Sequence, residues 1–194
     1  MSQTSRRTFL AGAAAGALAS TVARSRKARA AGADRVRLGL IGAGNQGKAH
    51  VRSLLSLPDA EIAVICDIDE GRLAERIGQA GGTPQGVTDF RRILDDPSID
   101  GVTIATPDHW HTPAALLALE AGKHVYVEKP CSHNVPEGQM LVAAARRHTR
   151  VVAHGTQARS SPGFREAMQM LREGVIGDVL MARCWNWQQR KNIG

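Results

Sequence analysis

Five runs rich in Val and Ile, each about the length of one strand, constrain the fold of this chain most strongly. They lie at residues 36–42, 60–67, 100–106, 123–128 and 150–155. Near-continuous apolar content without polar alternation is typical of strands buried on both faces of a parallel sheet. Between these runs, apolar spacing and capping residues predict helices at residues 45–56, 69–79, 89–95, 113–121 and 136–148. A brief strand at 86–88 completes an alternating order of strands and helices.

This alternation predicts the α/β fold class, with right-handed crossovers that place helices on both faces of a doubly wound sheet. We expect this domain to span residues 34–156. Thr112 before Pro113 predicts the start of one of its helices, and Gly122 the stop. Residues 157–194 predict the beginning of a second, incomplete domain. It contains a helix with Pro162 at its first position and Gly174 after its last turn, followed by a strand at 178–187.

The net charge of +7 is concentrated in the first 30 residues, which hold six basic side chains and no acidic one. The remaining residues carry 19 basic and 18 acidic side chains, so the rest of the chain is nearly neutral. Binding to nucleic acid requires a clustered cationic surface, usually with aromatic side chains, and aromatic residues make up only 4% of the chain. We therefore expect no nucleic-acid partner.

The first 30 residues resemble a twin-arginine signal peptide: "SRRTFLAGAAAGALAS" is followed by "ARA" at 28–30. A disordered basic arm and a membrane anchor are the alternatives, but the apolar run is shorter than the roughly 20 residues that span a bilayer. The resemblance implies export through the twin-arginine machinery to a periplasmic or other extracytoplasmic location, with cleavage after Ala30; an uncleaved tether is the alternative. Proteins exported this way fold in the cytoplasm, so the three cysteines predict no disulfide framework.

The segment "GLIGAGNQG" places three glycines in GxGxxG spacing between the first predicted strand and helix. Gly42 permits a tight turn, Gly44 lets the backbone approach a pyrophosphate, and Gly47 lets the helix pack against the strand. A helix N-terminus at this point favours an anion, so Asn45 and Gln46 are also candidate cofactor-binding residues. The alternative is a glycine-rich turn that binds nothing.

Asp67 lies 20 residues after Gly47, at the end of the second predicted strand. A carboxylate there can accept hydrogen bonds from the ribose hydroxyls of a dinucleotide and would repel a 2′-phosphate. The sequence therefore predicts NAD in preference to NADP. We interpret Arg72 as a solvated charge on a helix, but it leaves some room for the phosphorylated cofactor.

The loop "ATPDHWHTP", residues 105–113, follows the third long strand and should cover the cofactor. Thr106 and Pro107 shape its turn, and His111 orients the loop or contacts ligand, so all three are candidate cofactor-binding residues. Asp108 with the HxH pair could instead hold a metal. We expect no metal, because no further group with metal-site spacing is present.

The segment "YVEKPCSH" ends the fourth long strand with Glu128 and Lys129, our two candidate catalytic residues, which we also expect to contact the cofactor. A Lys at this strand tip could hydrogen-bond a substrate hydroxyl and assist proton transfer as hydride moves, while Glu128 steadies or tunes it. Solvation of a strand end is the alternative. Pro130 fixes the chain direction and is a candidate for a cis peptide bond.

Taken together, "GAGNQG", "ATPDHWHTPAALLALEAGKHVYVEKP" and "SSPGFREAMQMLREGVIGDVLMARCW" resemble the Gfo/Idh/MocA oxidoreductases, over about residues 35–187. The resemblance implies a Rossmann nucleotide-binding domain and Lys129 as the catalytic or substrate-orienting residue. It also implies that the second domain is an α/β domain with a large open sheet, which receives substrate and often forms a dimer interface. A second acid-base Asp or His is expected beyond the end of this sequence. Gln157 and Arg159 lie where family members approach nicotinamide or substrate, although a polar domain hinge explains them equally well.

The resulting expectation is an NAD-dependent oxidoreductase that acts on a sugar, cyclitol or related polyol, as a homo-oligomer in its full-length form. One alternative is an NAD-recycling glycosidase on the same scaffold, which would oxidise and then reduce a ring carbon with no net redox change. A second alternative is a dinucleotide-binding protein without catalytic activity. Trp185 and Trp187 alternate on the last predicted strand, as core or interface residues rather than sugar-stacking platforms.

Overall fold

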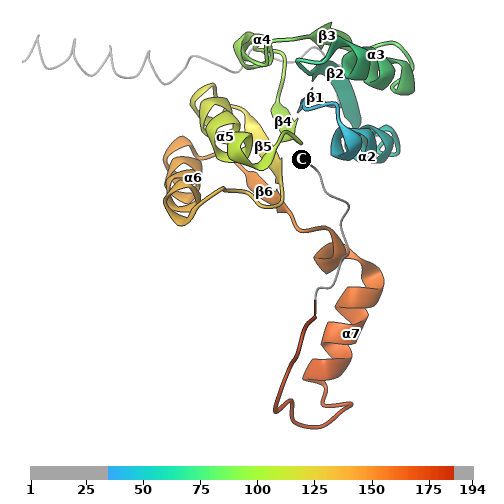
Figure 1. Cartoon of the computed structure of the whole chain (residues 1–194), viewed down its shortest axis with the longest axis vertical. Coiled ribbons are helices and arrows are strands. Elements are labelled where there is room, and N and C mark those ends of the chain that lie inside the picture. The colour runs from blue at the N-terminus through green and yellow to red at the C-terminus, as the bar shows by residue number, and fades with distance from the viewer. Residues whose placement is uncertain (1–34, 186–194) are drawn as a thin grey trace, which may run out of the picture.

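A six-stranded parallel sheet forms the centre of the molecule in the computed structural model, which describes residues 35–185. The strand order is β3-β2-β1-β4-β5-β6, with the reversal at β1 that a doubly wound sheet requires (Figure 1). This confirms the predicted α/β Rossmann fold. The strands are β1 (Val36–Ile41), β2 (Ala60–Cys66), β3 (Gln85–Val87), β4 (Gly101–Ile104), β5 (His124–Glu128) and β6 (Val152–Gly155).

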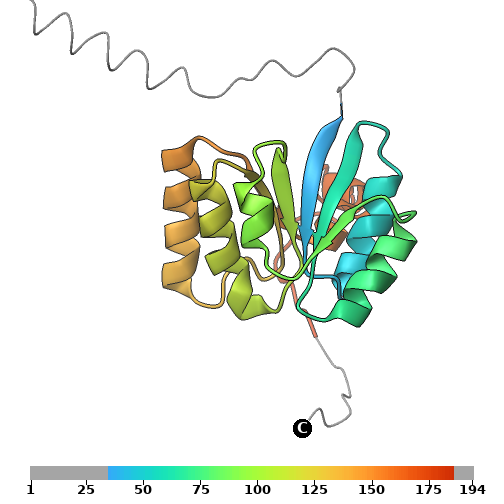
Figure 2. The same cartoon turned by 90° about the horizontal axis from the view of Figure 1, so that it is seen from above.

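Helices cover the sheet from both sides, as Figure 2 shows. On one side lie α2 (Asn45–Leu55) and α3 (Glu70–Gln79), and on the other α4 (Arg91–Asp95), α5 (His111–Glu120) and α6 (Val135–His148). Neighbouring residues of β1 point into different cores: Leu40 belongs to the cluster under α2 and α3, and Ile41 to the cluster under α4, α5 and α6. Both side chains are almost fully buried, each contributing about 1.5–3 kcal/mol.

The strand β5 departs from the expectation that every long strand is buried on both faces. Val125 and Val127 are buried against the α5 and α6 side, but Tyr126 is 37% exposed on the opposite face and His124 is exposed beside it. The prediction was wrong for this face because α2 and α3 pack over β1, β2 and β3, and no other helix among the described residues covers β5 and β6 there.

The start of α5 also differs from the sequence expectation. A 3-10 turn, η1 (Asp108–Trp110), leads directly into the helix at His111, so Thr112 lies inside the first turn and is not its cap. The Thr112 hydroxyl instead donates a hydrogen bond to the Cys131 carbonyl, 2.9 Å away. The stop at Gly122 is confirmed, since this residue has a φ of +76° that favours glycine.

Beyond the sheet, η2 (Gln157–Ser160) leads into α7 (Pro162–Arg172), which projects away from the sheet in Figure 1. Ser161 caps this helix by accepting a hydrogen bond from the Phe164 amide, and Gly174 follows it with a φ of +78°, as predicted. The strand expected at 178–187 is wrong over 178–185, because the backbone there finds no neighbouring strand to pair with. Trp187 and the signal-like residues 1–30 lie outside the described residues.

None of the helices within residues 35–185 combines the length and the apolar character needed to cross a membrane.

Candidate functional site

The turn between β1 and α2 is built by its glycines. Gly42 has a φ of +100°, and a side chain there would lie 2.6 Å from the backbone of Ala105, so the turn passes tightly against the end of β4. At Gly44, by contrast, an added Cβ would meet nothing within 4 Å. Gly44 is also the N-cap of α2 and no side chain caps this helix. The open space and the uncapped amide groups fit a pyrophosphate.

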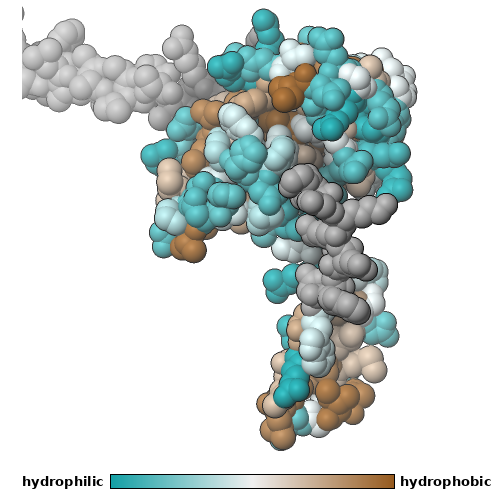
Figure 3. All heavy atoms as spheres, in the orientation of Figure 1, coloured by the Kyte–Doolittle hydropathy of each residue, from teal (hydrophilic) through white to brown (hydrophobic). Residues whose placement is uncertain are grey.

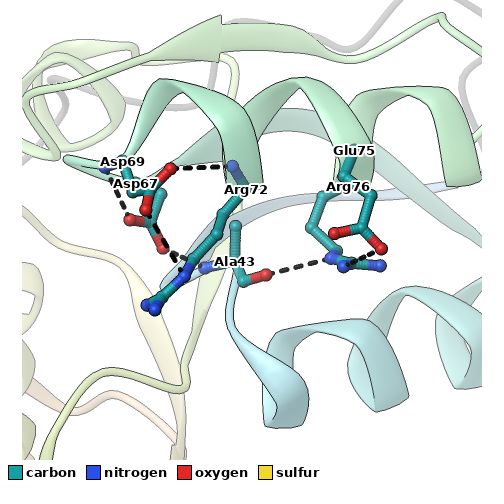
Figure 4. Close-up of polar contacts among 6 residues, drawn as sticks. All are labelled: Ala43, Asp67, Asp69, Arg72, Glu75 and Arg76. Atoms are coloured by element: carbon teal, nitrogen blue, oxygen red, sulfur yellow. Dashed lines mark hydrogen bonds and ion pairs between the residues drawn. The ribbon is translucent and has the colours of Figure 1, made fainter.

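The carboxylate of Asp67, at the end of β2, holds this turn from one side. One of its oxygens accepts a hydrogen bond from the Ala43 amide at 2.6 Å, and the other accepts one from the Asp69 amide at 2.9 Å (Figure 4). Each carboxylate oxygen retains a second lone pair, and the side chain is only half-buried. Asp67 can therefore still accept hydrogen bonds from ribose hydroxyls while it orders the turn.

Arg76 of α3 holds the same turn from the other side, and sequence reasoning missed it. Its Nε donates to the Ala43 carbonyl at 2.9 Å, and another guanidinium nitrogen pairs with Glu75 (Figure 4). The remaining nitrogen donates to the Gln79 side chain at 2.7 Å. The side chain is only 5% exposed. An Arg three residues after the buried Leu73, and so on the same face of the helix, is the signal that could have revealed it.

Arg72 lies one turn earlier on α3 and remains exposed. Its amide donates to the Asp69 carboxylate at 3.0 Å, and its Nε lies 3.5 Å from the other oxygen of the same group (Figure 4). Asp69 is thus the N-cap of α3 and also the charge partner of Arg72. This ion pair partly neutralises the positive charge of Arg72 at the edge of the site.

Glu128 and Lys129 diverge at the end of β5. The Glu128 carboxylate is buried against α2, where one oxygen accepts hydrogen bonds from Gln46 at 3.0 Å and from His50 at 2.9 Å. Burial works to raise the pKa of Glu128, but these hydrogen bonds outweigh it and hold the pKa below its ordinary value. Lys129 is exposed, and its peptide bond to Pro130 is cis, as predicted.

His111 joins the loop after β4 to the segment after β5. One ring nitrogen lies 2.8 Å from the Thr106 carbonyl and the other 2.5 Å from the Pro130 carbonyl. The ring is 2% exposed, and its two contacts join the loop to the segment after β5. A contact between His111 and ligand stays a prediction. Pro107 is exposed beside it.

The Thr106 hydroxyl is buried and has no hydrogen-bond partner among the described residues. Such a group is costly unless it is satisfied, so its position at the end of β4 is consistent with a polar ligand atom or a water there. Gln157 is exposed after β6 with a φ of +48°, and Arg159 is exposed in the same 3-10 turn. Both stay predictions.

Because the strands are parallel, their carboxyl ends lie at one edge of the sheet. This edge brings together most of the residues predicted from the sequence: the glycine turn, Asp67, Thr106 and Lys129. Across residues 35–185, no group of three or more His, Cys, Asp or Glu side chains is arranged to hold a metal ion. The residues present fit a dinucleotide, with an open turn at one end and an exposed amine at the other.

Comparison with known proteins agrees with this geometry. Residues 36–156 match the family model described as "Oxidoreductase family, NAD-binding Rossmann fold". The chain is 32% identical over 151 residues to inositol 2-dehydrogenase 1 of Saccharopolyspora erythraea, covering 77% of this chain and 45% of that protein. It is 33% identical over 153 residues to a glycosyl hydrolase family 109 protein of the same organism, covering 75% and 33%.

Among solved structures, a levoglucosan dehydrogenase in complex with NADH and levoglucosan superposes with a TM-score of 0.68 at 32% identity. The match covers 74% of this chain and 40% of that one. In each of these three comparisons the chain therefore spans less than half the length of the protein that it matches.

Proposed function

The chain belongs to the Gfo/Idh/MocA oxidoreductase family, and we propose that it forms the NAD-binding part of a dehydrogenase that acts on a sugar, cyclitol or related polyol. The chain spans less than half the length of these relatives. The dehydrogenase activity that we propose is therefore that of a whole protein of which this chain forms the NAD-binding part. The observation that carries it is the exposed Lys129 at the same sheet edge as the open glycine turn.

Each part of the site has a defined task in this proposal. The amides at Gly44, Asn45 and Gln46 hold the pyrophosphate, Asp67 binds the adenosine ribose, and the loop with Thr106, Pro107 and His111 covers the nicotinamide end. Bound NAD supplies a hydride acceptor at nicotinamide C4. The amine of Lys129 hydrogen-bonds the substrate hydroxyl and takes its proton as the carbon is oxidised, then returns it in the reverse reaction.

The preference for NAD over NADP rests on Asp67. Its carboxylate would face the ribose of the cofactor, where it accepts hydrogen bonds from hydroxyls and repels a 2′-phosphate. Arg72 is the cation nearest in sequence that could offset this repulsion, but its guanidinium is already paired with Asp69. The family model and the NADH-bound relative both support NAD.

The proposal is tested by incubating the purified full-length protein with NAD and a panel of cyclitols, hexoses and anhydrosugars, and following NADH formation. We expect turnover with at least one polyol and a lower rate with NADP. A protein that binds NADH but turns over no polyol would support the dinucleotide-binding alternative instead.

A second candidate is an NAD-recycling glycosidase, which the similarity to a glycosyl hydrolase family 109 protein favours. Both functions require a bound dinucleotide and Lys129, but they differ in net redox outcome. Release of the aryl group from an aryl glycoside, without any net change in NADH, would identify hydrolysis. Stoichiometric NADH formation from a free polyol would identify the dehydrogenase.

The proposal extends to location and assembly. The signal-like sequence at residues 1–30 supports export by the twin-arginine route. Exposed apolar side chains gather at the far end of α7 and after it, where Figure 3 shows brown spheres; they include Val175, Ile176, Val179, Leu180 and Met181. Such a surface is typical of an interface, and it supports a second domain and a homo-oligomer in the full-length protein.

A further inference from the structure

The buried carboxylate of Glu128 connects two parts of the site that are far apart in the sequence. On one oxygen it accepts hydrogen bonds from the side chains of Gln46 and His50, which are 82 and 78 residues away. Its other oxygen lies 3.3 Å from the backbone amide of Lys129, which donates to it. A single side chain therefore links α2 to the backbone that carries the exposed amine.

The helix α2 is also the helix that would bind the cofactor. It begins at Asn45 directly after the glycine turn, and Gln46 lies in its first turn. His50 lies one turn further along the same face and is buried. A displacement of the N-terminal end of α2 when a pyrophosphate binds would therefore act directly on the donors to Glu128.

His50 contacts two residues of β5, Tyr126 and Glu128. Its ring packs edge-on against Tyr126 of β5, with ring centroids 5.4 Å apart and an interplanar angle of 79°. Its Nε2 is the nitrogen that contacts Glu128, while the buried Nδ1 has no partner among the described residues. The contact to Glu128 is thus the only hydrogen bond of this ring within residues 35–185.

From these contacts we propose that His50 and Gln46 are positioning residues: through the Glu128 carboxylate they couple the cofactor-binding end of α2 to the placement of Lys129. The coupling rests on the proposed function for the role of Lys129 in the reaction. It does not require that the substrate be known. Glu128, which the sequence suggested as a catalytic group, acts here through Lys129 rather than on the substrate.

The test uses ADP-ribose, which carries the pyrophosphate and both riboses but has no nicotinamide ring to shield Lys129 directly. The full-length protein is labelled with trace acetic anhydride, and the labelling rate of the Lys129 amine is measured by peptide mass spectrometry. Rates are compared with and without saturating ADP-ribose, whose binding is measured separately by calorimetry.

In the wild type we expect ADP-ribose to change the labelling rate of Lys129 by about twofold or more. In His50→Leu we expect this response to disappear, although ADP-ribose still binds within about fivefold of its wild-type affinity. His50→Gln should restore most of the response because its side-chain amide can still donate to Glu128. His148→Gln, on α6 and away from the site, is the matched control and should respond like the wild type.

A response that persists unchanged in His50→Leu would overturn the coupling, and so would its absence from a wild-type protein that binds ADP-ribose. Absence of ADP-ribose binding would overturn both the coupling and the cofactor assignment. If His50→Leu fails to fold, Gln46→Ala removes the other side-chain donor to Glu128 at a half-buried position, while it keeps the backbone amide that is assigned to the pyrophosphate. A coupled response in a protein without turnover would contradict only the proposed dehydrogenase.

A further readout separates positioning from a purely structural role. With a substrate identified, His50→Leu should lower kcat about tenfold or more with little change in the KM for NAD, and His50→Gln should recover most of the loss. A variant that loses thermal stability but keeps its kcat per folded molecule would contradict the proposal.

Discussion

The exposed amine of Lys129 stands at the end of β5, next to a buried carboxylate and a cis peptide bond. Replacing it with Ala should lower kcat by about 10²–10⁴-fold, the usual contribution of a positioned acid-base group. NADH affinity, measured by fluorescence titration, should stay within about threefold. Lys129→Arg is the matched variant: it keeps the positive charge but does not deprotonate near neutral pH. Substantial activity in Lys129→Arg would indicate substrate orientation rather than proton transfer.

Asp67 offers a second test at a single position. Asp67→Asn removes the charge but keeps one oxygen that can accept from the Ala43 amide. Because a hydrogen bond to a charged group contributes about 1.5–3 kcal/mol, NAD affinity should fall by roughly tenfold or more, while NADP should lose less. The measurement is the ratio of the two dissociation constants. Asp59→Asn, exposed just before the start of β2, is the control; an unchanged ratio in Asp67→Asn would contradict the assignment.

The depressed pKa of Glu128 predicts a pH dependence of stability. A carboxyl group with a lower pKa in the folded state stabilises the fold above its unfolded value, about 4.5, and this contribution is lost as pH falls through the folded pKa. His50 faces this carboxylate directly, and Tyr126 packs beside the His50 ring.

We therefore expect the difference in unfolding free energy between wild type and Glu128→Gln to be largest near neutral pH. It should shrink as the pH is lowered below about 4.5. Urea denaturation at a series of pH values measures it. A difference that is constant across this range would show that the charge of Glu128 contributes little.

At the scale of elements, α3 orders the glycine turn through Arg76. Replacing Arg76 with Met would leave the Ala43 carbonyl without its donor, at a cost of about 1–3 kcal/mol, and would loosen the turn that is to bind the pyrophosphate. We expect both a lower melting temperature and weaker ADP-ribose binding. Arg72→Met, on the same helix but exposed, should change neither by much. Equal effects of the two substitutions would mean that the turn does not depend on Arg76.

The elements themselves were largely predictable because their signals are local. The apolar runs, the capping Ser161 and the glycines after α5 and α7 each act through neighbouring residues, and the structure confirms these elements. The prediction that Thr112 starts α5 was wrong because its hydroxyl donates a hydrogen bond to the Cys131 carbonyl, 19 residues away. The strand expected after α7 failed for a related reason, since a strand exists only where another strand is available to pair with it.

At the scale of the whole molecule, the twin-arginine-like leader and the dinucleotide site make a joint prediction. NAD is made in the cytoplasm, so an exported enzyme would have to fold around its cofactor before translocation and release it slowly. Protein purified from the periplasm should therefore contain bound dinucleotide, detectable by mass spectrometry after denaturation. Recovery of an empty protein that requires added NAD would count against this prediction.

The sequence by itself determined the α/β class, the glycine turn and the positions of Asp67 and Lys129 at strand ends. These features follow from backbone freedom at glycine, from hydrophobic periodicity and from the rule that parallel strands end at one edge. Only the tertiary structure decided that Glu128 turns inward to Gln46 and His50, that Arg76 holds the Ala43 carbonyl, and that Tyr126 of β5 stays partly exposed. Each of these depends on which distant elements pack together, and residue type and local spacing do not encode that choice.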